Sequence, residues 1–196
     1  MSYPPRYFTC TDDALIRQFL QQHYFGLLLS CQSGLHYSPL PFFIEQQPQG
    51  WQLACHLARS NPQLQELDGQ PVTVVIQGPH AFVSAACYPE KPAVSTWNYL
   101  LVEFKGLARL LTPEQTLSLA RRQESHSDPQ LEQSADYQQK LLAGIQGVQI
   151  EVDNVTARFK LSQNKNPQQH QAVLQYLQQH EQADFVWRWM QQPGSE

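Results

Sequence analysis

The spacing of hydrophobic and polar positions changes several times along the chain, and each change marks a predicted element. Near the start, apolar residues recur at helical spacing, which predicts a helix over residues 12–24 with Thr11 or Asp12 as its cap. Residues 51–57 alternate instead with the period of a half-buried strand. The chain therefore combines helices with strands that have one buried face.

A β-hairpin is predicted directly after the first helix. The apolar run 25–31 and the extended segment 35–44 are separated by the polar turn 32–34. Pro39 and Pro41 cannot donate ladder hydrogen bonds, so we expect the second strand to be irregular or at a sheet edge.

Further elements follow from the same signals. Glycine and proline predict a turn at 78–80 and a loop at 88–94. Apolar alternation predicts strands at 72–76, 97–110 and 148–152, with short extended pieces at 81–84 and 159–161. Capping residues before a proline predict helices that begin near 62 and 113, the second continuing with interruptions near 127–129 to about 145, and a helical tail over 167–192.

The order of these elements predicts an α+β fold with a mainly β core. No repeated βαβ alternation occurs, which weakens a doubly wound fold. Short strands joined by tight turns favour a small antiparallel barrel with helices at its margins. The 196 residues fit one domain, 1–196, which ends in a helical tail at about 165–192.

Composition narrows the classes of function. Only 15% of residues are charged, Lys plus Arg number 13 and the net charge is −4, which argues against a generic nucleic-acid coat. The 41% hydrophobic and 11% aromatic residues argue against intrinsic disorder. The 30 glutamines bias the polar surface in a way that has no functional interpretation from the sequence.

Compartment and metal content are also constrained. The first ten residues lack the order of a signal peptide and no apolar run has the length of a membrane span, so we expect a soluble, cytoplasmic protein. Cys10, Cys31, Cys55 and Cys87 lie far apart, so we expect reduced, mostly buried thiols. Histidine pairs at metal-ligand spacing are absent, and we expect no metal.

Residues 56–62, HLARSNP, contain the parts of an anion site. Backbone N–H groups at a helix start, the helix dipole and the guanidinium of Arg59 predict phosphate binding. The alternative is an ordinary helix cap beside a surface arginine. From these residues alone the alternative is favoured, because such helix starts are common.

Two other segments concentrate hydrogen-bonding groups. Residues 95–99, STWNY, place an amide between two aromatic residues, which suits either a planar ligand or a core Trp beside an edge Tyr. Residues 160–166, KLSQNKN, are dense in donors, and the alternative is a helix cap that leads into Pro167. No nucleophile elbow, P-loop or dinucleotide glycine fingerprint occurs.

Together these blocks resemble a known family. The PaiB family, FMN-binding negative transcriptional regulators also described as protease synthase and sporulation regulators, has four such blocks in the same order, here at 56–62, 78–81, 95–99 and 160–164. Residues 3–8 and 38–41 also fit, so the resemblance covers about residues 3–177.

The resemblance implies an FMN-binding split β-barrel, related to pyridoxamine phosphate oxidases and small flavin reductases. Such proteins dimerise and place FMN at the subunit interface, and Arg59 and Ser60 take a role like that of their phosphate clamp. Carried over by motif, the expected cofactor-binding residues are Ser38, His56, Arg59, Ser60, Asn61, Trp97, Asn98, Tyr99, Lys160, Ser162, Gln163 and Asn164.

Three functions follow as alternatives. One is a flavin-binding regulator or sensor, and another is an FMN-dependent reductase or oxidase acting on a small substrate. A third is a scaffold without FMN, because the family's Ser-Pro-Ser-Trp-Tyr is Ser84-Ala85-Ala86-Cys87-Tyr88 here, which predicts a wider pocket or weaker FMN binding. Direct DNA binding is weakly supported, because Lys and Arg are scattered and Arg121-Arg122 is their one adjacent pair.

Overall fold

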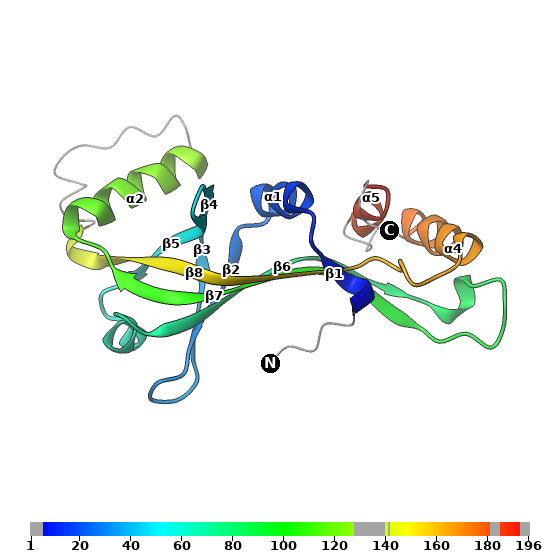
Figure 1. The fold of residues 1–196 in the computed structure, drawn as a ribbon, viewed down its shortest axis with the longest axis horizontal. Helices are drawn as coiled ribbons and strands as arrows, with labels where there is room; N and C mark the ends of the chain where they lie inside the picture. The colour runs from blue at the N-terminus through cyan, green and yellow to red at the C-terminus, as the bar shows by residue number, and fades with distance from the viewer. Residues whose placement is uncertain (1–5, 128–139, 141, 181–184, 193–196) are drawn as a thin grey trace. The chain divides into compact units, whose positions relative to one another are not determined.

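The computed structural model describes residues 6–127, 140, 142–180 and 185–192, and its core is mainly β (Figure 1). The strands are β1 (Thr9–Cys10), β2 (Phe25–Ser30), β3 (His36–Pro41), β4 (Phe43–Gln47), β5 (Gly50–Ala58), β6 (Pro71–Val83), β7 (Thr96–Leu110) and β8 (Ile145–Lys160). The helices are α1 (Asp13–Gln22), α2 (Pro113–Ser127), α4 (Pro167–Gln178) and α5 (Val186–Met190), with short 3-10 helices η1 (Arg6–Phe8), η2 (Pro62–Glu66) and η3 (Ala85–Cys87).

The strands are hydrogen-bonded in the order β3-β2-β6-β7-β8-β5-β4, and β1 pairs with β8. The β2–β3, β2–β6, β4–β5 and β5–β8 ladders are antiparallel, as the sequence predicts. Two compact units divide the chain, and the long strands β6, β7 and β8 contribute to both. The mainly β core with helices at its margins confirms the predicted fold class.

Unit 2 spans Tyr24–Ile76 and Glu103–Val155. The strands of this unit direct apolar side chains into its core, and Leu28, Leu53 and Phe104 are among those that are fully buried. β3 contacts β5 although the two are not neighbours in the ladder order, so this part of the sheet curves as a barrel requires. Helix α2 packs against β5.

Unit 1 comprises the described parts of Met1–His23, Gln77–Val102 and Thr156–Glu196. Its helices α1, α4 and α5 lie along one side of its strand segments (Figure 1). The rings of Phe19, Phe159 and Trp189 form its core, with centroids 5.3 to 6.1 Å apart. This aromatic cluster joins α1 and α5 to the end of β8.

The turn predicted at 78–80 is wrong, because β6 continues through it as one strand. Gly78 faces the ring of Phe19, and a Cβ at this position would overlap that ring. The β2 ladder ends at Ile76, so Pro79 removes no N–H from it. Gly78 is therefore required for close packing, and Pro79 lies in a part of β6 that no longer pairs with β2.

The segment predicted as one strand over 35–44 is two strands. β3 ends at Pro41 and β4 begins at Phe43, and the N–H of Phe42 between them donates to the carbonyl of Tyr24 at 2.7 Å. β3 lies at the end of the ladder order, which confirms the edge position that its prolines predict.

Helix starts are confirmed where a local cap predicts them. Thr112 and Gln115 form a reciprocal capping box before α2, with N···O distances of 2.9 and 3.3 Å. The tail is two helices, α4 and α5, and the predicted helical sequence at 128–139 and 181–184 lies outside the described residues. No helix in the described ranges is long and apolar enough to cross a membrane.

Replacing Gly78 by Ala should destabilise the protein by about 1–3 kcal/mol, because the new methyl group meets the fully buried ring of Phe19. Urea denaturation of wild type and variant measures the difference. Gly144→Ala is the control, since a Cβ at Gly144 meets no atom of the described residues within 4 Å. Equal stability of the two variants would contradict the packing constraint.

Candidate functional site

The twelve predicted site residues fall in both units, and each group is described separately. Ser38, His56, Arg59, Ser60 and Asn61 belong to unit 2. The remaining members, which belong to unit 1, are Trp97, Asn98, Tyr99, Lys160, Ser162, Gln163 and Asn164.

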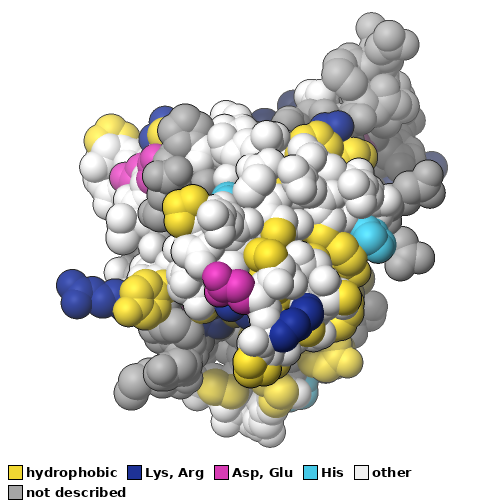
Figure 2. Space-filling view, turned by 90° about the vertical axis from the view of Figure 1, so that its right-hand side faces the viewer, with side chains coloured by type: hydrophobic (Ala, Val, Ile, Leu, Met, Phe, Trp, Pro, Cys, Tyr) yellow, Lys and Arg dark blue, Asp and Glu magenta, His cyan; other side chains and the backbone are white. Residues whose placement is uncertain are grey.

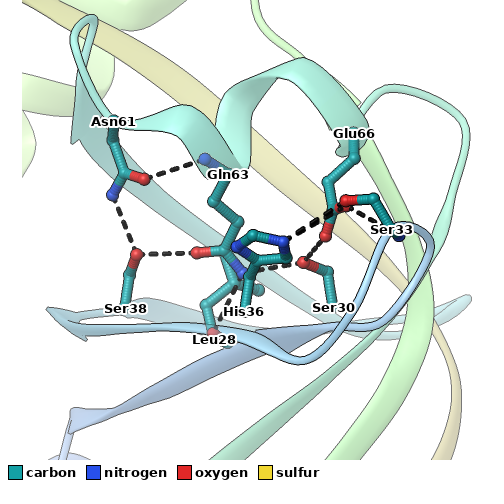
Figure 3. A network of polar contacts seen from close by, with 8 residues as sticks. All are labelled: Leu28, Ser30, Ser33, His36, Ser38, Asn61, Gln63 and Glu66. Carbon is teal, nitrogen blue, oxygen red and sulfur yellow. Dashed lines mark hydrogen bonds and ion pairs between the residues drawn. The ribbon is translucent and has the colours of Figure 1, made fainter.

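A buried amide connects two of the predicted residues of unit 2, Ser38 and Asn61 (Figure 3). Gln63 of η2 is 2% exposed, and its Oε1 accepts from the hydroxyl of Ser38 at 2.6 Å. Its Nε2 donates to the carbonyl of Leu28 at 3.2 Å and to Ser30 Oγ at 3.0 Å. Asn61 donates from Nδ2 to Ser38 Oγ at 2.9 Å. These bonds fasten η2 to the β2–β3 hairpin.

Glu66 continues the same network at the other end of η2. Its carboxylate accepts from the hydroxyl of Ser30, and from the hydroxyl and N–H of Ser33 at 2.6 and 3.2 Å. The ring of His36 lies 4.0 Å away. The hydrogen bonds from Ser30 and Ser33 hold the pKa of Glu66 below its usual value. Sequence reasoning missed Glu66 and Gln63, and the polar residues Ser30 and Ser38 at inward strand positions were the available signal.

Arg59 and Ser60 are exposed at the point where β5 leads into η2. The guanidinium of Arg59 is oriented by the chain itself: Nε donates to the carbonyl of Leu142 and Nη1 to Oε1 of Gln146, each at 3.2 Å. In the described part of the chain, no carboxylate lies within ion-pair distance of Arg59. The Arg59–Ser60 pair therefore presents an oriented guanidinium next to a hydroxyl.

The backbone donors expected at the start of η2 are already used. Asn61 Oδ1 accepts from the N–H of Gln63 at 3.0 Å, and the carbonyl of Asn61 accepts from the N–H of Leu64 at 3.2 Å. Asn61 is thus the cap of η2, which begins at Pro62 as the sequence predicts. An anion here would meet the side chains of Arg59 and Ser60 rather than the helix N-terminus.

His56 points toward α2 rather than toward Arg59. Its Nδ1 lies 2.7 Å from Oε1 of Gln123, and Gln123 Nε2 donates to the carbonyl of Pro41 at 3.3 Å. The ring therefore forms part of a link between β5, α2 and the end of β3.

Within unit 1, Asn98 and Ser162 bond to each other. Both are buried, and Ser162 Oγ donates to Asn98 Oδ1 at 3.1 Å. Asn98 Nδ2 lies 3.7 Å from the sulfur of Met190. Gln163 folds back on its own strand end, accepting from the N–H of Leu161 at 2.7 Å. These polar groups hold the end of β8 and the segment after it in place.

Lys160 is half-buried, and its Nζ donates to Thr96 Oγ1 at 2.5 Å. Burial, and then the charge of Lys165, lower its pKa. Trp97 is 52% exposed, Tyr99 is half-buried and Asn164 is exposed.

The segment that departs from the family pattern ends in a buried tyrosine. Tyr88 is 3% exposed, and among the described residues its hydroxyl has no hydrogen-bond partner. Lys165 Nζ lies 4.9 Å from the centre of its ring. Burial raises the pKa of Tyr88.

The four cysteines are free, but the expectation that most are buried is wrong. Only Cys55 is buried, and burial raises its pKa to about 12. Cys31 is exposed, because it follows β2 in the hairpin turn, whereas Cys10 and Cys87 are half-buried. No cluster of His, Cys, Asp or Glu that would suit a metal ion occurs in the ranges the structure describes.

The fold is that of known flavin- and haem-binding proteins. The FAD and heme binding protein of Mycobacterium smegmatis superposes with a TM-score of 0.64 at 15% identity, covering 84% of this chain and 78% of that one. The flavocytochrome Anf3 of Azotobacter vinelandii gives 0.62 at 13% identity, covering 80% and 72%. The conserved hypothetical protein Rv2991 of Mycobacterium tuberculosis gives 0.60 at 11% identity, covering 85% and 94%. These likenesses confirm the split-barrel fold class.

Sequence comparison identifies the family. Residues 2–154 match the family described as "Putative FMN-binding domain". The chain is also 31% identical over 188 residues to protease synthase and sporulation protein PAI 2 of Bacillus subtilis (strain 168), covering 91% of this chain and 90% of that protein. This chain belongs to the FMN-binding domain family, which confirms the resemblance drawn from its motifs.

Glu66→Gln should lower the melting temperature most at neutral pH. The lowered pKa of Glu66 means that its ionised form is favoured in the folded state, so its contribution is present above the ordinary Glu pKa of about 4.3 and is lost as the pH falls through the lower folded value. Thermal melts at several pH values measure the difference, with exposed Glu90→Gln as the control. A deficit that stays constant down to pH 3 would contradict this linkage.

Proposed function

We propose that this protein binds FMN and that the phosphate of FMN contacts Arg59 and Ser60. The observation that carries the proposal is the oriented, exposed guanidinium of Arg59, which has no carboxylate partner in the described residues. By contrast, Arg122 is paired with Glu45 at 2.6 Å. A guanidinium matches phosphate oxygens in both charge and fork geometry.

The hydrogen-bond donors of Arg59 and Ser60 that make no bond to another described residue suit a phosphate. Nε and Nη1 of Arg59 bond to Leu142 and Gln146, which leaves Nη2 and the hydroxyl of the exposed Ser60 as donors for a phosphate. The capping bonds of Asn61 keep the backbone of this step fixed, which reduces the ordering cost of binding. FMN, when bound, supplies redox chemistry that no side chain of the protein provides.

The proposal includes a homodimer with the flavin at the subunit interface. Its support is the outer apolar face of the β2–β3 hairpin, where the cross-strand pairs on one side are all apolar and exposed or half-buried. The members of this outer apolar face are Phe25, Leu27, Leu29, Tyr37, Pro39 and Pro41. A contiguous apolar surface of this kind is typical of a protein contact.

Two roles for a bound flavin are compatible with this site: a cytoplasmic PaiB-type transcriptional regulator, and an oxidoreductase acting on a small substrate. Anaerobic mixing of the FMN-loaded protein with NADH or NADPH separates them, because rapid bleaching identifies a reductase. The net charge of −4 favours a regulator that acts without extensive phosphate contacts to DNA.

FMN should bind the purified protein with a shifted visible spectrum, and Arg59→Ala should weaken binding about tenfold or more, as expected for the loss of a charged hydrogen bond. Fluorescence titration measures the dissociation constants. Arg109→Ala is the matched control, since Arg109 is an exposed arginine of the same unit that is paired with Glu151. Absence of FMN binding by the wild type would sink the proposal and favour the scaffold alternative.

Leu27→Glu should convert the dimer to a monomer, because it places a charge within the outer apolar face. Sedimentation velocity measures the mass of wild type and variant. Gln49→Glu, an exposed change in the β4–β5 turn, should leave the dimer intact. A monomeric wild type contradicts the dimer, and a dimeric Leu27→Glu variant contradicts this choice of face.

A further inference from the structure

Unit 1 contains a pocket of about 280 Å³ between the β6–β7 strands and α4. Apart from Trp97, its lining is absent from the predicted site. The main lining residues are His80, Phe82, Trp97, Tyr176, Leu177 and His180.

Aromatic side chains of this pocket are exposed although they are large. Trp97 and Phe82 are 52% and 46% exposed, and their rings meet edge to face with centroids 5.6 Å apart. The ring of His80 lies 6.0 Å from that of Trp97. Figure 2, which faces the right-hand side of Figure 1, shows hydrophobic side chains at several places on this surface, interspersed with basic and acidic ones. These rings contribute little to the core, so their exposed surface is available to a ligand.

On the α4 side the pocket is lined by two neighbouring rings, those of Tyr176 and His180, and the imidazole of His180 provides a polar atom. The rings of Tyr176 and His180 lie 4.0 Å apart, and His180 Nδ1 is 2.7 Å from the carbonyl of Tyr176. A carbonyl oxygen only accepts, so Nδ1 carries the proton. In the neutral imidazole, Nε2 is then the acceptor left for a ligand.

Among the residues that the structure describes, the lining contains no Asp, Glu, Lys or Arg, which argues against a strongly charged ligand. Leu177 is 1% exposed and provides an apolar floor. Aromatic walls, an apolar floor and an imidazole acceptor together match a flat ring that carries an N–H group.

We propose that this pocket binds a planar heteroaromatic ring with an N–H donor. Such a ring has two sources: the isoalloxazine of FMN, in which case the inference rests on the proposed function, or a separate small molecule. Because the two rings are inclined by 63°, the ligand stacks on the face of one of Trp97 and Phe82, meets the other at its edge, and donates to His180.

Lumiflavin, which has the isoalloxazine ring without the phosphate, is the probe. Its fluorescence is titrated with the full-length wild type and with Trp97→Leu, Phe82→Leu and Tyr7→Leu, the last an exposed aromatic residue outside the pocket. Lumiflavin should bind the wild type and the Tyr7→Leu variant equally. Binding to the two pocket variants should be about tenfold weaker, as expected for the loss of one stacking partner.

The same titration with saturating FMN distinguishes the two sources. Competition identifies FMN as a ligand of the pocket, and undiminished lumiflavin binding identifies a site for a second molecule. If FMN does not bind but lumiflavin does, the proposed function fails and the pocket stands. The pocket is overturned if lumiflavin does not bind, if neither pocket variant weakens it, or if Trp97→Leu changes the oligomeric state, which would make this surface a subunit contact.

Discussion

The buried amide of Gln63 is the constraint on which the arrangement of unit 2 depends. Its side-chain oxygen and nitrogen are hydrogen-bonded to Ser38 of β3 and to Leu28 and Ser30 of β2. Any shift of η2 would therefore leave a buried amide or hydroxyl unpaired, at a cost of about 1–3 kcal/mol per group. Because η2 is fixed, its cap Asn61 is fixed as well, and the exposed step Arg59–Ser60 lies directly before that cap. The backbone of Arg59 is therefore held in position before any ligand binds, unlike that of an arginine in a flexible surface loop.

Gln63 is one of several glutamines that act as uncharged connectors. Gln146 donates to the carbonyls of Leu111 and Gly147 while its Oε1 accepts from Arg59. Gln123 links β5 to the end of β3 in the same way. An amide can donate and accept at once without the desolvation cost of a charge. Part of the glutamine excess, which has no interpretation at the level of composition, therefore has a structural role in a chain with few charges.

What the sequence predicts well is local. The cap at Asn61 and the capping box at Thr112 depend on residues within four positions of each other, and both are confirmed. The prediction of a turn at 78–80 is wrong because Gly78 is needed for close packing against Phe19, which lies far away in sequence. For the same reason Gln63 is missed, since its partners in β2 and β3 are 25 to 35 positions away. Family motifs supply the candidate site, but they carry no information on which members are exposed.

Exposure distinguishes the two cations that the motifs treat alike, Arg59 and Lys160. Lys160 already donates to Thr96, and burial together with the charge of Lys165 lowers its pKa, so its charged form is held less firmly. A guanidinium stays charged at any physiological pH and can keep two bonds to the chain while presenting a third nitrogen to a ligand. Arg59 does this at the surface, with no acidic partner in the described residues to compete for it. For these reasons the proposed phosphate contact is assigned to Arg59 rather than to Lys160.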